Sequence, residues 1–313
     1  MYDLLVITGP TASGKTALGV EAALALHGEV VSADSMQVYR GMDIGTAKPT
    51  AEERRGVPHH MLDVADPREN YSAAKYAEEA AACVEDIRKR GRLPIVVGGT
   101  GLYIEGLLRG TEYAAAPADP SLRRSLEEEY DRVGGEAFRE TLRTVDPDRA
   151  ALLSPGDKKR LVRAREVYIL TGETITAHDE RSRSVPPRYS ALTIALDFRE
   201  RADLYDRIDR RAEDMFKRGL VREVRELLAA GVPMESTAMQ AIGYKETAAY
   251  LRGQCTLEEA VDAVRRKSRQ YAKRQLTWLR RDDSVLWIRW KKEPDIAVIR
   301  QLSTDFPDGS AVK

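Results

Sequence analysis

Short apolar runs alternate with amphipathic segments in the first hundred residues. Short strand-like runs rich in apolar residues occur at 4–8, 29–33 and 93–97 and are each followed by polar or turn residues, a pattern typical of buried strands. Helices are predicted between them, at about 17–26 and 73–90, and a glycine follows the end of each as a stop signal. Strands that alternate with helices in this way predict a parallel sheet.

The pattern changes from about 113 to 190. Strand signals disappear, and prolines separate short, highly charged segments of helical periodicity. We interpret 113–190 as a helical insertion into a core that is formed by 1–112 and 191–313. An apolar run at 192–196 predicts a fourth strand that returns the chain to this core.

Helical periodicity dominates the remaining sequence. An apolar stripe runs along 204–228, where Gly219 is a possible break. A further helix is predicted at 257–279 and a late strand at 284–290. We expect the tail beyond residue 303 to be frayed.

Composition narrows the class of protein. The 313 residues contain 50 basic and 50 acidic side chains, so no global field indicates a nucleic-acid partner. No apolar run approaches the roughly 20 residues that span a membrane, and the chain starts directly with a strand, so we expect neither a membrane span nor a signal peptide. Cys83 and Cys255 are interpreted as buried thiols. Together these features predict a cytoplasmic protein.

The first strand leads into a glycine-rich loop that matches the phosphate-loop pattern G-x-x-x-x-G-K-[ST] at every fixed position. It consists of Gly9, Pro10, Thr11, Ala12, Ser13, Gly14, Lys15 and Thr16. A strand, a glycine loop and a helix N-terminus together form an anion site, because backbone N–H groups and the helix dipole favour negative charge. Lys15 adds positive charge, and the Thr16 hydroxyl can ligate Mg²⁺. The loop therefore predicts a di- or triphosphate ligand.

Asp34 follows the second strand, and Gly98-Gly99-Thr100-Gly101 follows the third. Because ligands lie at the carboxyl ends of parallel strands, these residues are expected beside the phosphate loop. Asp34 is a candidate general base or a carboxylate that acts through Mg²⁺, and its alternative role is a helix N-cap. The third strand lacks the aspartate of a conventional nucleotide hydrolase, which argues against hydrolysis. Its glycines permit close approach of a ligand, and the Thr100 hydroxyl could donate to developing negative charge.

Two segments concentrate basic residues, 158–165 and 265–281. They fit contact with a phosphate backbone, with Tyr271 and Trp278 as stacking surfaces. Solvated helix faces with the aromatic rings in the core explain the same pattern, and the pattern alone leaves both interpretations open. His59-His60 has no accompanying cluster of metal ligands, which favours packing or hydrogen bonding.

Over nearly its whole length the chain resembles the tRNA dimethylallyltransferases, also called tRNA isopentenyltransferases. The resemblance is carried by an ordered set of motifs: the phosphate loop, Asp34 to Pro49, Pro58 to Asp63, Gly98 to Tyr103, Ile242 to Glu246 and Lys273 to Trp278. It implies an α/β fold, a phosphate-loop kinase-like parallel sheet flanked by helices with an inserted helical domain. It also implies a monomer that transfers a dimethylallyl group from dimethylallyl diphosphate to N6 of the adenine 3′-adjacent to the anticodon, in tRNAs that read codons beginning with U.

The resemblance also implies residue roles. Asp34 would accept the N6 proton, Thr100 would position the reacting groups, and Arg207 would bind the diphosphate. Gly9 to Thr16 would hold the diphosphate, with Mg²⁺ as cofactor on Thr16. The positions that match tRNA contacts are Asp34, Ser35, Met36, Gln37, Thr100, Arg123, Lys159, Arg160, Leu161, Val162, Arg163, Gln240, Gly243, Tyr244, Lys245, Lys273, Arg274, Gln275, Trp278 and Arg280.

Three alternatives remain at this point. An adenylate isopentenyltransferase, which acts on free AMP, ADP or ATP, would share the loop and Asp34, whereas the basic insertion favours tRNA. A small-molecule kinase that uses ATP is disfavoured by the glycines after the third strand. A nucleic-acid-binding module with a structural phosphate loop would show no turnover.

Overall fold

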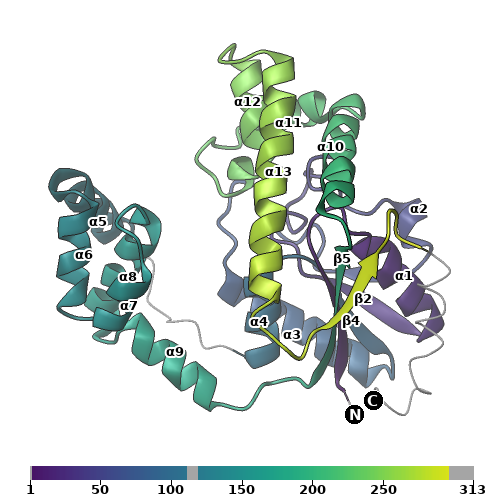
Figure 1. The fold of residues 1–313 in the computed structure, drawn as a ribbon, viewed down its shortest axis with the longest axis horizontal. Helices are drawn as coiled ribbons and strands as arrows, with labels where there is room; N and C mark the ends of the chain where they lie inside the picture. Colours follow the sequence, from purple (N-terminus) through teal and green to yellow (C-terminus); the bar gives the residue numbers. More distant parts are fainter. Residues whose placement is uncertain (1, 111–118, 296–313) are drawn as a thin grey trace. The chain divides into compact units, whose positions relative to one another are not determined.

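A single parallel sheet organises the core of the protein (Figure 1). The computed structural model describes residues 2–110 and 119–295. The sheet has the strand order β3-β2-β4-β1-β5-β6, and every neighbouring pair is parallel. The strands are β1 (Leu4–Thr8), β2 (Gly28–Ser32), β3 (His59–His60), β4 (Leu93–Val97), β5 (Ala191–Phe198) and β6 (Leu286–Trp290). The predicted α/β class is confirmed, and the short edge strand β3 is the strand that the sequence pattern did not reveal.

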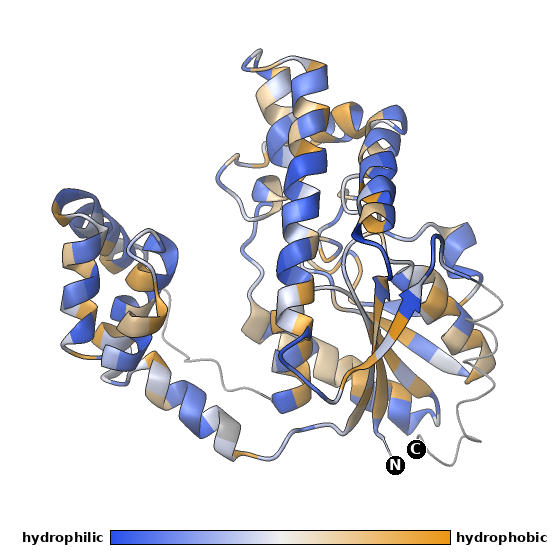
Figure 2. Cartoon of the chain, viewed as in Figure 1, coloured by the Kyte–Doolittle hydropathy of each residue, from blue (hydrophilic) through white to orange (hydrophobic). Residues whose placement is uncertain are grey.

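Both faces of this sheet are covered, which explains why its strands are apolar without alternation. In β1, Leu4 and Val6 face one hydrophobic cluster, whereas Leu5 and Ile7 face another on the opposite side. Figure 2 shows the hydrophobic strands at the centre of the core. The first cluster includes α3 (Ala73–Lys89), α4 (Gly101–Arg109), α11 (Leu220–Ala229) and α12 (Tyr244–Leu251). The second includes α1 (Lys15–Ala25), α10 (Arg201–Lys217) and part of α13 (Leu257–Leu279).

The predicted helices agree with those observed to within a few residues. The apolar stripe at 204–228 divides into α10 and α11 at Gly219, whose φ of 106° lies in the left-handed region that glycine adopts without strain. The helical elements that were not predicted are α2 (Ala51–Arg54), α4, the 3₁₀ helix η1 (Ala238–Gln240) and α12. The tail beyond residue 303 lies outside the described residues.

The chain divides into two compact units, Met1–Leu108 with Arg188–Lys313, and Arg109–Pro187. These boundaries lie within a few residues of the predicted 112/113 and 190/191, and the first predicted boundary falls in 111–118, outside the described residues. The second unit contains α5 (Pro120–Val133), α6 (Gly135–Arg143), α7 (Pro147–Leu152), α8 (Lys158–Thr171) and α9 (Ile175–Ser184).

Local capping explains the short helices of the second unit. Pro120 and Pro147 occupy first-turn positions, where a missing N–H costs nothing. The side chains of Asp119 and Asp146 accept hydrogen bonds from the backbone N–H groups that follow. These helices surround a hydrophobic cluster of their own that includes Phe138.

Candidate active site

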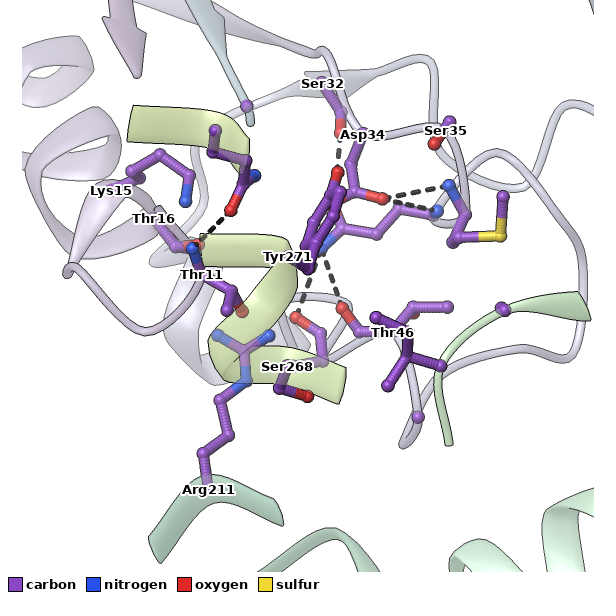
Figure 3. A pocket seen from close by; sticks show the side chains of 18 of the residues that line it. Thr11, Lys15, Thr16, Ser32, Asp34, Ser35, Thr46, Arg211, Ser268 and Tyr271 are labelled. Atoms are coloured by element: carbon purple, nitrogen blue, oxygen red, sulfur yellow. Dashed lines mark hydrogen bonds between the residues drawn. The ribbon is translucent and has the colours of Figure 1, made fainter. Parts of the chain in front are cut away.

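The carboxyl ends of β1, β2 and β4 open into a cavity of about 380 Å³. In Figure 3 the side chains of Lys15, Thr16, Asp34, Arg211 and Tyr271 converge on it. It is lined by the phosphate loop, the segment after β2, the loop 45–49, α10, the segment 237–242 and α13. The strand-end rule thus located the site in the predicted fold.

The phosphate loop is held in place by residues distant in sequence. Thr11 N–H donates to Oε1 of Gln275 at 2.9 Å, and the Trp290 indole N–H donates to the Ser13 carbonyl at 3.0 Å. Of the eight predicted loop residues, Thr11, Lys15 and Thr16 line the cavity. The remaining loop residues do not line the cavity; they are Gly9, Pro10, Ala12, Ser13 and Gly14. Contacts from α13 and β6 therefore brace the loop.

Lys15 and Arg211 place two cationic side chains on the phosphate-loop side of the cavity. Lys15 Nζ donates to the Pro10 carbonyl at 2.7 Å. Burial, followed by the positive charge of Arg211, lowers the pKa of Lys15 to about 7. Burial also lowers the pKa of Arg211, against the opposing effect of Asp34, and the buried Nε of Arg211 has no hydrogen-bond partner within the described residues. An anion in this cavity would relieve both unfavourable charges.

Arg211 was missed by the sequence analysis, which assigned the diphosphate to Arg207. Arg207 is not among the described residues that line the cavity. Its Nε donates to the Ala12 carbonyl at 3.0 Å, and its guanidinium forms an ion pair with Glu293. Arg207 thus contacts the phosphate loop in this structure, and its contact with the diphosphate stays a prediction. Two arginines four residues apart share one helix face, so periodicity alone did not distinguish them.

Asp34 lies directly after β2 and lines the cavity with Ser35, Met36 and Gln37. Its Oδ1 accepts the backbone N–H groups of Met36, at 2.9 Å, and Gln37, at 3.3 Å. The second oxygen, Oδ2, accepts no hydrogen bond from the described residues. No helix begins after Asp34, so the N-cap alternative is wrong: Oδ1 orders a turn instead. The catalytic role of Asp34 stays a prediction, and Oδ2 is free of the turn.

Thr100 supports this turn rather than lining the cavity. Its Oγ1 accepts the Ser35 N–H at 3.0 Å and donates to Ser35 Oγ at 3.3 Å. Near Asp34 the cavity is lined by the hydroxyl-bearing residues Ser32, Ser35 and Tyr271. Burial raises the pKa of Tyr271 to about 12, so its phenol stays protonated. Thr100 thus supports the turn that follows Asp34, and its role in positioning the reacting groups stays a prediction.

The glycines after β4 accommodate α13. A Cβ at Gly99 would lie 2.2 Å from Nε2 of Gln275, and one at Gly101 would lie 2.4 Å from the Trp278 ring. Gln275 Nε2 also donates to the Gly99 carbonyl at 2.9 Å. Gln275 and Trp278, predicted as tRNA contacts, therefore lock α13 against the phosphate loop and the end of β4. Gln275 also lines the cavity, whereas Trp278, Gly99 and Gly101 do not.

The basic residues of α13 fall into two groups. Toward its N-terminus Arg265, Lys267 and Arg269 form ion pairs with acidic residues of α10 and α12. Nearer its C-terminus Lys273 and Arg274 are exposed, and Arg274 also lines the cavity. Arg280, which follows α13, is exposed and lies 3.5 Å from Asp197. The paired residues stabilise the packing of α13, and contact of the exposed residues with tRNA stays a prediction.

The insertion shows a similar division. Lys159 and Arg160 are exposed at the start of α8, as predicted for a contact surface. Leu161 and Val162 are 0% and 2% exposed within the cluster around Phe138, so their side chains offer no surface for tRNA. That corrects their assignment.

Arg123 and Arg163 share a buried partner in the same unit. Both form ion pairs with Glu166, at 2.6 and 2.7 Å, and Glu166 is fully buried. In this structure the two arginines neutralise a carboxylate inside the insertion, in addition to any role at its surface.

The predicted tRNA contacts at 240–245 include both exposed and buried residues. Gln240 is exposed and lines the cavity, and Lys245 is exposed. Gly243 and Tyr244 are buried. The Tyr244 hydroxyl donates to Glu223 at 2.5 Å, so its side chain is unavailable to a ligand, which corrects that assignment.

The histidines and cysteines have local explanations. His60 Nε2 lies 2.7 Å from Glu29, and His59 Nδ1 lies 2.9 Å from the Val57 carbonyl. No cluster of three or more His, Cys, Asp or Glu residues that could hold a metal occurs in the described residues. Cys83 and Cys255 are half-buried, not fully buried as expected. Among the described residues, no helix is both long and apolar enough to cross a membrane.

The fold and the cavity define a phosphate-loop α/β protein with two basic side chains, Lys15 and Arg211, in the same cavity as a carboxylate. The family model described as IPP transferase matches residues 37–282. The chain belongs to this family.

Similar proteins match over nearly the whole chain. A tRNA dimethylallyltransferase of Geobacter metallireducens is 48% identical over 92% of each chain, and one of Acetivibrio thermocellus is 44% identical over 96% of each. The solved tRNA isopentenylpyrophosphate transferase of Bacillus halodurans has a TM-score of 0.72 at 43% identity, covering 96% of this chain and 94% of its own. A eukaryotic dimethylallyltransferase, solved in a study of its action on tRNA, has a TM-score of 0.75 at 31% identity, with 88% and 69% covered.

Proposed function

We propose that this protein transfers a dimethylallyl group from dimethylallyl diphosphate to N6 of the adenine 3′-adjacent to the anticodon, in tRNAs that read codons beginning with U. The observation that carries the proposal is the cavity, in which a cationic phosphate-loop wall faces Asp34. The relatives named for tRNA dimethylallyl transfer, which match over almost the full chain, support it. They favour tRNA over a free adenine nucleotide as acceptor, and transfer over phosphorylation.

The donor's diphosphate occupies the phosphate-loop side of the cavity. Its charge is met by Lys15, Arg211 and the backbone N–H groups at the start of α1. These groups stabilise the leaving diphosphate most as the carbon–oxygen bond breaks, because negative charge then accumulates on it.

The oxygen ligands in the cavity fit Mg²⁺. Thr16 supplies a hydroxyl at the phosphate-loop side of the cavity. Mg²⁺ prefers such oxygen ligands and completes its shell with phosphate and water. A bound Mg²⁺ would neutralise charge on the diphosphate, with Thr16 as its protein ligand.

The acceptor adenine enters from the side of Asp34. The N6 nitrogen attacks the allylic C1 of the donor, the C1–oxygen bond breaks, and its electron pair leaves with the diphosphate. Oδ2 of Asp34 takes the proton that N6 loses. An adenine whose N6 is held in line with the allylic carbon, away from bulk water, reacts far faster than one in solution.

Exposed cations lie where a tRNA backbone can be bound. Lys273, Arg274 and Arg280 belong to the unit that contains the cavity, and Lys159 and Arg160 belong to the insertion. Contacts with phosphates provide affinity without sequence specificity. The adenine must leave its stack, which is least costly in the single-stranded anticodon loop.

The decisive experiment offers radiolabelled dimethylallyl diphosphate and Mg²⁺ with unmodified tRNA, and separately with AMP and ATP. Label in tRNA alone is expected. Label in AMP or ATP would establish an adenylate isopentenyltransferase instead. Absence of label from all acceptors, with phosphorylation of a small molecule by ATP, would establish a kinase.

A further inference from the structure

The loop 43–47 forms one wall of the cavity and is anchored from behind by a buried carboxylate. Gly45, Thr46 and Ala47 line the cavity. Behind them Glu223 of α11 is 8% exposed. Its Oε2 accepts the N–H groups of Asp43, at 3.0 Å, and Ile44, at 2.7 Å, and its Oε1 accepts that of Gly45, at 3.1 Å. One side chain therefore fixes three consecutive peptide groups.

Tyr244 completes this anchor from α12. Its hydroxyl donates to Oε1 of Glu223 at 2.5 Å, and its side chain is fully buried. Burial, together with the charge of Glu223, raises the pKa of Tyr244 well above its ordinary value, so it remains a donor. A Cβ at Gly45 would lie 2.4 Å from the Tyr244 ring. The loop and the ring are thus in close contact, and Gly45 is required there.

The anchored loop in turn holds Gln37, which lies next to the reacting carboxylate. Gln37 Nε2 donates to the carbonyls of Thr46, at 3.2 Å, and Ala47, at 3.3 Å, and its Oε1 accepts from Ser32 at 3.1 Å. Its backbone N–H donates to Oδ1 of Asp34. A continuous chain of hydrogen bonds therefore runs from Glu223 through the loop and Gln37 to Asp34.

We propose that Glu223 and Tyr244 are positioning residues that hold the loop 43–47 and Gln37 in the geometry required by the acceptor base. This inference rests on the proposed function. Neither residue lines the cavity among those described, so both act through the loop. The phosphate loop is braced separately, by Gln275 and Trp290. Loss of the anchor should therefore affect the acceptor side and spare the donor side.

Two near-isosteric variants test the proposal, Glu223→Gln and Tyr244→Phe. Glu223→Gln weakens the side chain that accepts four hydrogen bonds, three from the loop and one from Tyr244. Tyr244→Phe removes the hydroxyl that donates to Glu223 and leaves the ring in place. Because a displacement of about 1 Å can lower a rate by about 10²-fold, kcat/KM for an unmodified anticodon stem-loop RNA should fall by about 10- to 100-fold in Glu223→Gln. Tyr244→Phe should show a smaller loss. Binding of inorganic diphosphate should stay within about twofold of the wild type.

Glu226→Gln is the matched control. Glu226 lies on the same helix, its side chain is 71% exposed, and it pairs only with Arg222 among the described residues. Its variant removes the same charge and should retain wild-type kinetics. Wild-type kcat/KM for RNA in both Glu223→Gln and Tyr244→Phe would overturn the proposal. Diphosphate affinity that falls in parallel with turnover would also overturn it, because that result indicates a general structural role.

Hydrogen exchange separates this proposal from the proposed function. The amides of Asp43, Ile44 and Gly45 should exchange faster in Glu223→Gln than in the wild type, while protection of the sheet is unchanged. If the wild type transfers no prenyl group but this difference appears, the proposed reaction fails and the anchor stands. Unchanged exchange at these amides would refute the anchor, whatever the activity.

Discussion

The two carboxylate oxygens of Asp34 have different environments, and this difference makes its role testable. Oδ1 accepts two backbone N–H groups of the following turn. Asp34→Asn can keep these two bonds through its amide oxygen but cannot take a proton. We expect kcat to fall by about 10²- to 10⁴-fold, as for loss of a general base, with little change in RNA affinity. Single-turnover transfer and a binding titration measure the two quantities, and a turnover close to wild type would exclude Asp34 as the base.

Lys15 makes diphosphate binding sensitive to pH. Its pKa is lowered to about 7, so the amine is largely neutral at pH 8. A bound diphosphate favours the charged form, and binding at pH 8 should therefore take up close to one proton at Lys15. The uptake should vanish well below pH 7, where the free protein already carries this proton.

Calorimetry in buffers of different ionisation enthalpy measures that proton. The ligand titrates as well, and Lys15→Met provides the control because only the contribution of the ligand remains. The wild type should take up more protons than Lys15→Met at pH 8, and the two should converge below about pH 6. Equal uptake at pH 8 would mean that Lys15 is already charged in the free protein.

At the scale of the elements, Glu29 ties three segments of the sheet edge together. It is the second residue of β2, is 2% exposed, and pairs with Arg90 after α3, with Arg92 and with His60 of β3. The hydrogen bond from Arg90 is the main cause that lowers the pKa of Glu29 to about 2. Because the folded pKa lies below the unfolded value, this pair stabilises the fold fully above about pH 4.5 and loses that effect as pH falls toward 2.

Glu29→Gln should therefore lower the free energy of unfolding by about 2 kcal/mol at pH 7, after allowance for the partly solvated arginines. Urea titrations at pH 7, and in steps down to the lowest pH at which both proteins remain folded, measure the difference. It should shrink below pH 4.5. A difference that does not depend on pH would show that packing, rather than charge, accounts for the loss.

Elements and local motifs were largely predictable, whereas contacts between elements were not. The phosphate loop and Asp34 follow apolar strands, so their position at one sheet edge follows from the fold. Arg211 lies one helical turn from Arg207, and only the packing of α10 determines which of them reaches the cavity. Gln275 and Trp278 occur in a basic run, yet they pack against glycines of a distant loop. Leu161 and Val162 are the exception, because two apolar residues within a basic helix already indicated the core.

For the whole molecule, a net charge of zero conceals a local concentration of cations. In the insertion, Arg123 and Arg163 are engaged by Glu166, whereas Lys159 and Arg160 are exposed. If these exposed residues contact tRNA phosphates, binding releases about one counterion for each contact. Substituting both by alanine should weaken tRNA binding and reduce the slope of log Kd against log salt by about 1.5, while transfer to saturating RNA keeps its rate.

Lys217→Ala with Arg222→Ala is the charge-matched control, because both residues are exposed in the core unit, on α10 and α11. That variant loses the same two charges and should keep the wild-type slope. Equal effects of the two double variants would indicate a response to net charge alone. If the salt dependence of binding is unchanged in the Lys159 and Arg160 variant, the phosphate contacts lie elsewhere. The exposed cations Lys273, Arg274 and Arg280, in and just after α13, are then the next candidates, because they belong to the unit that contains the cavity.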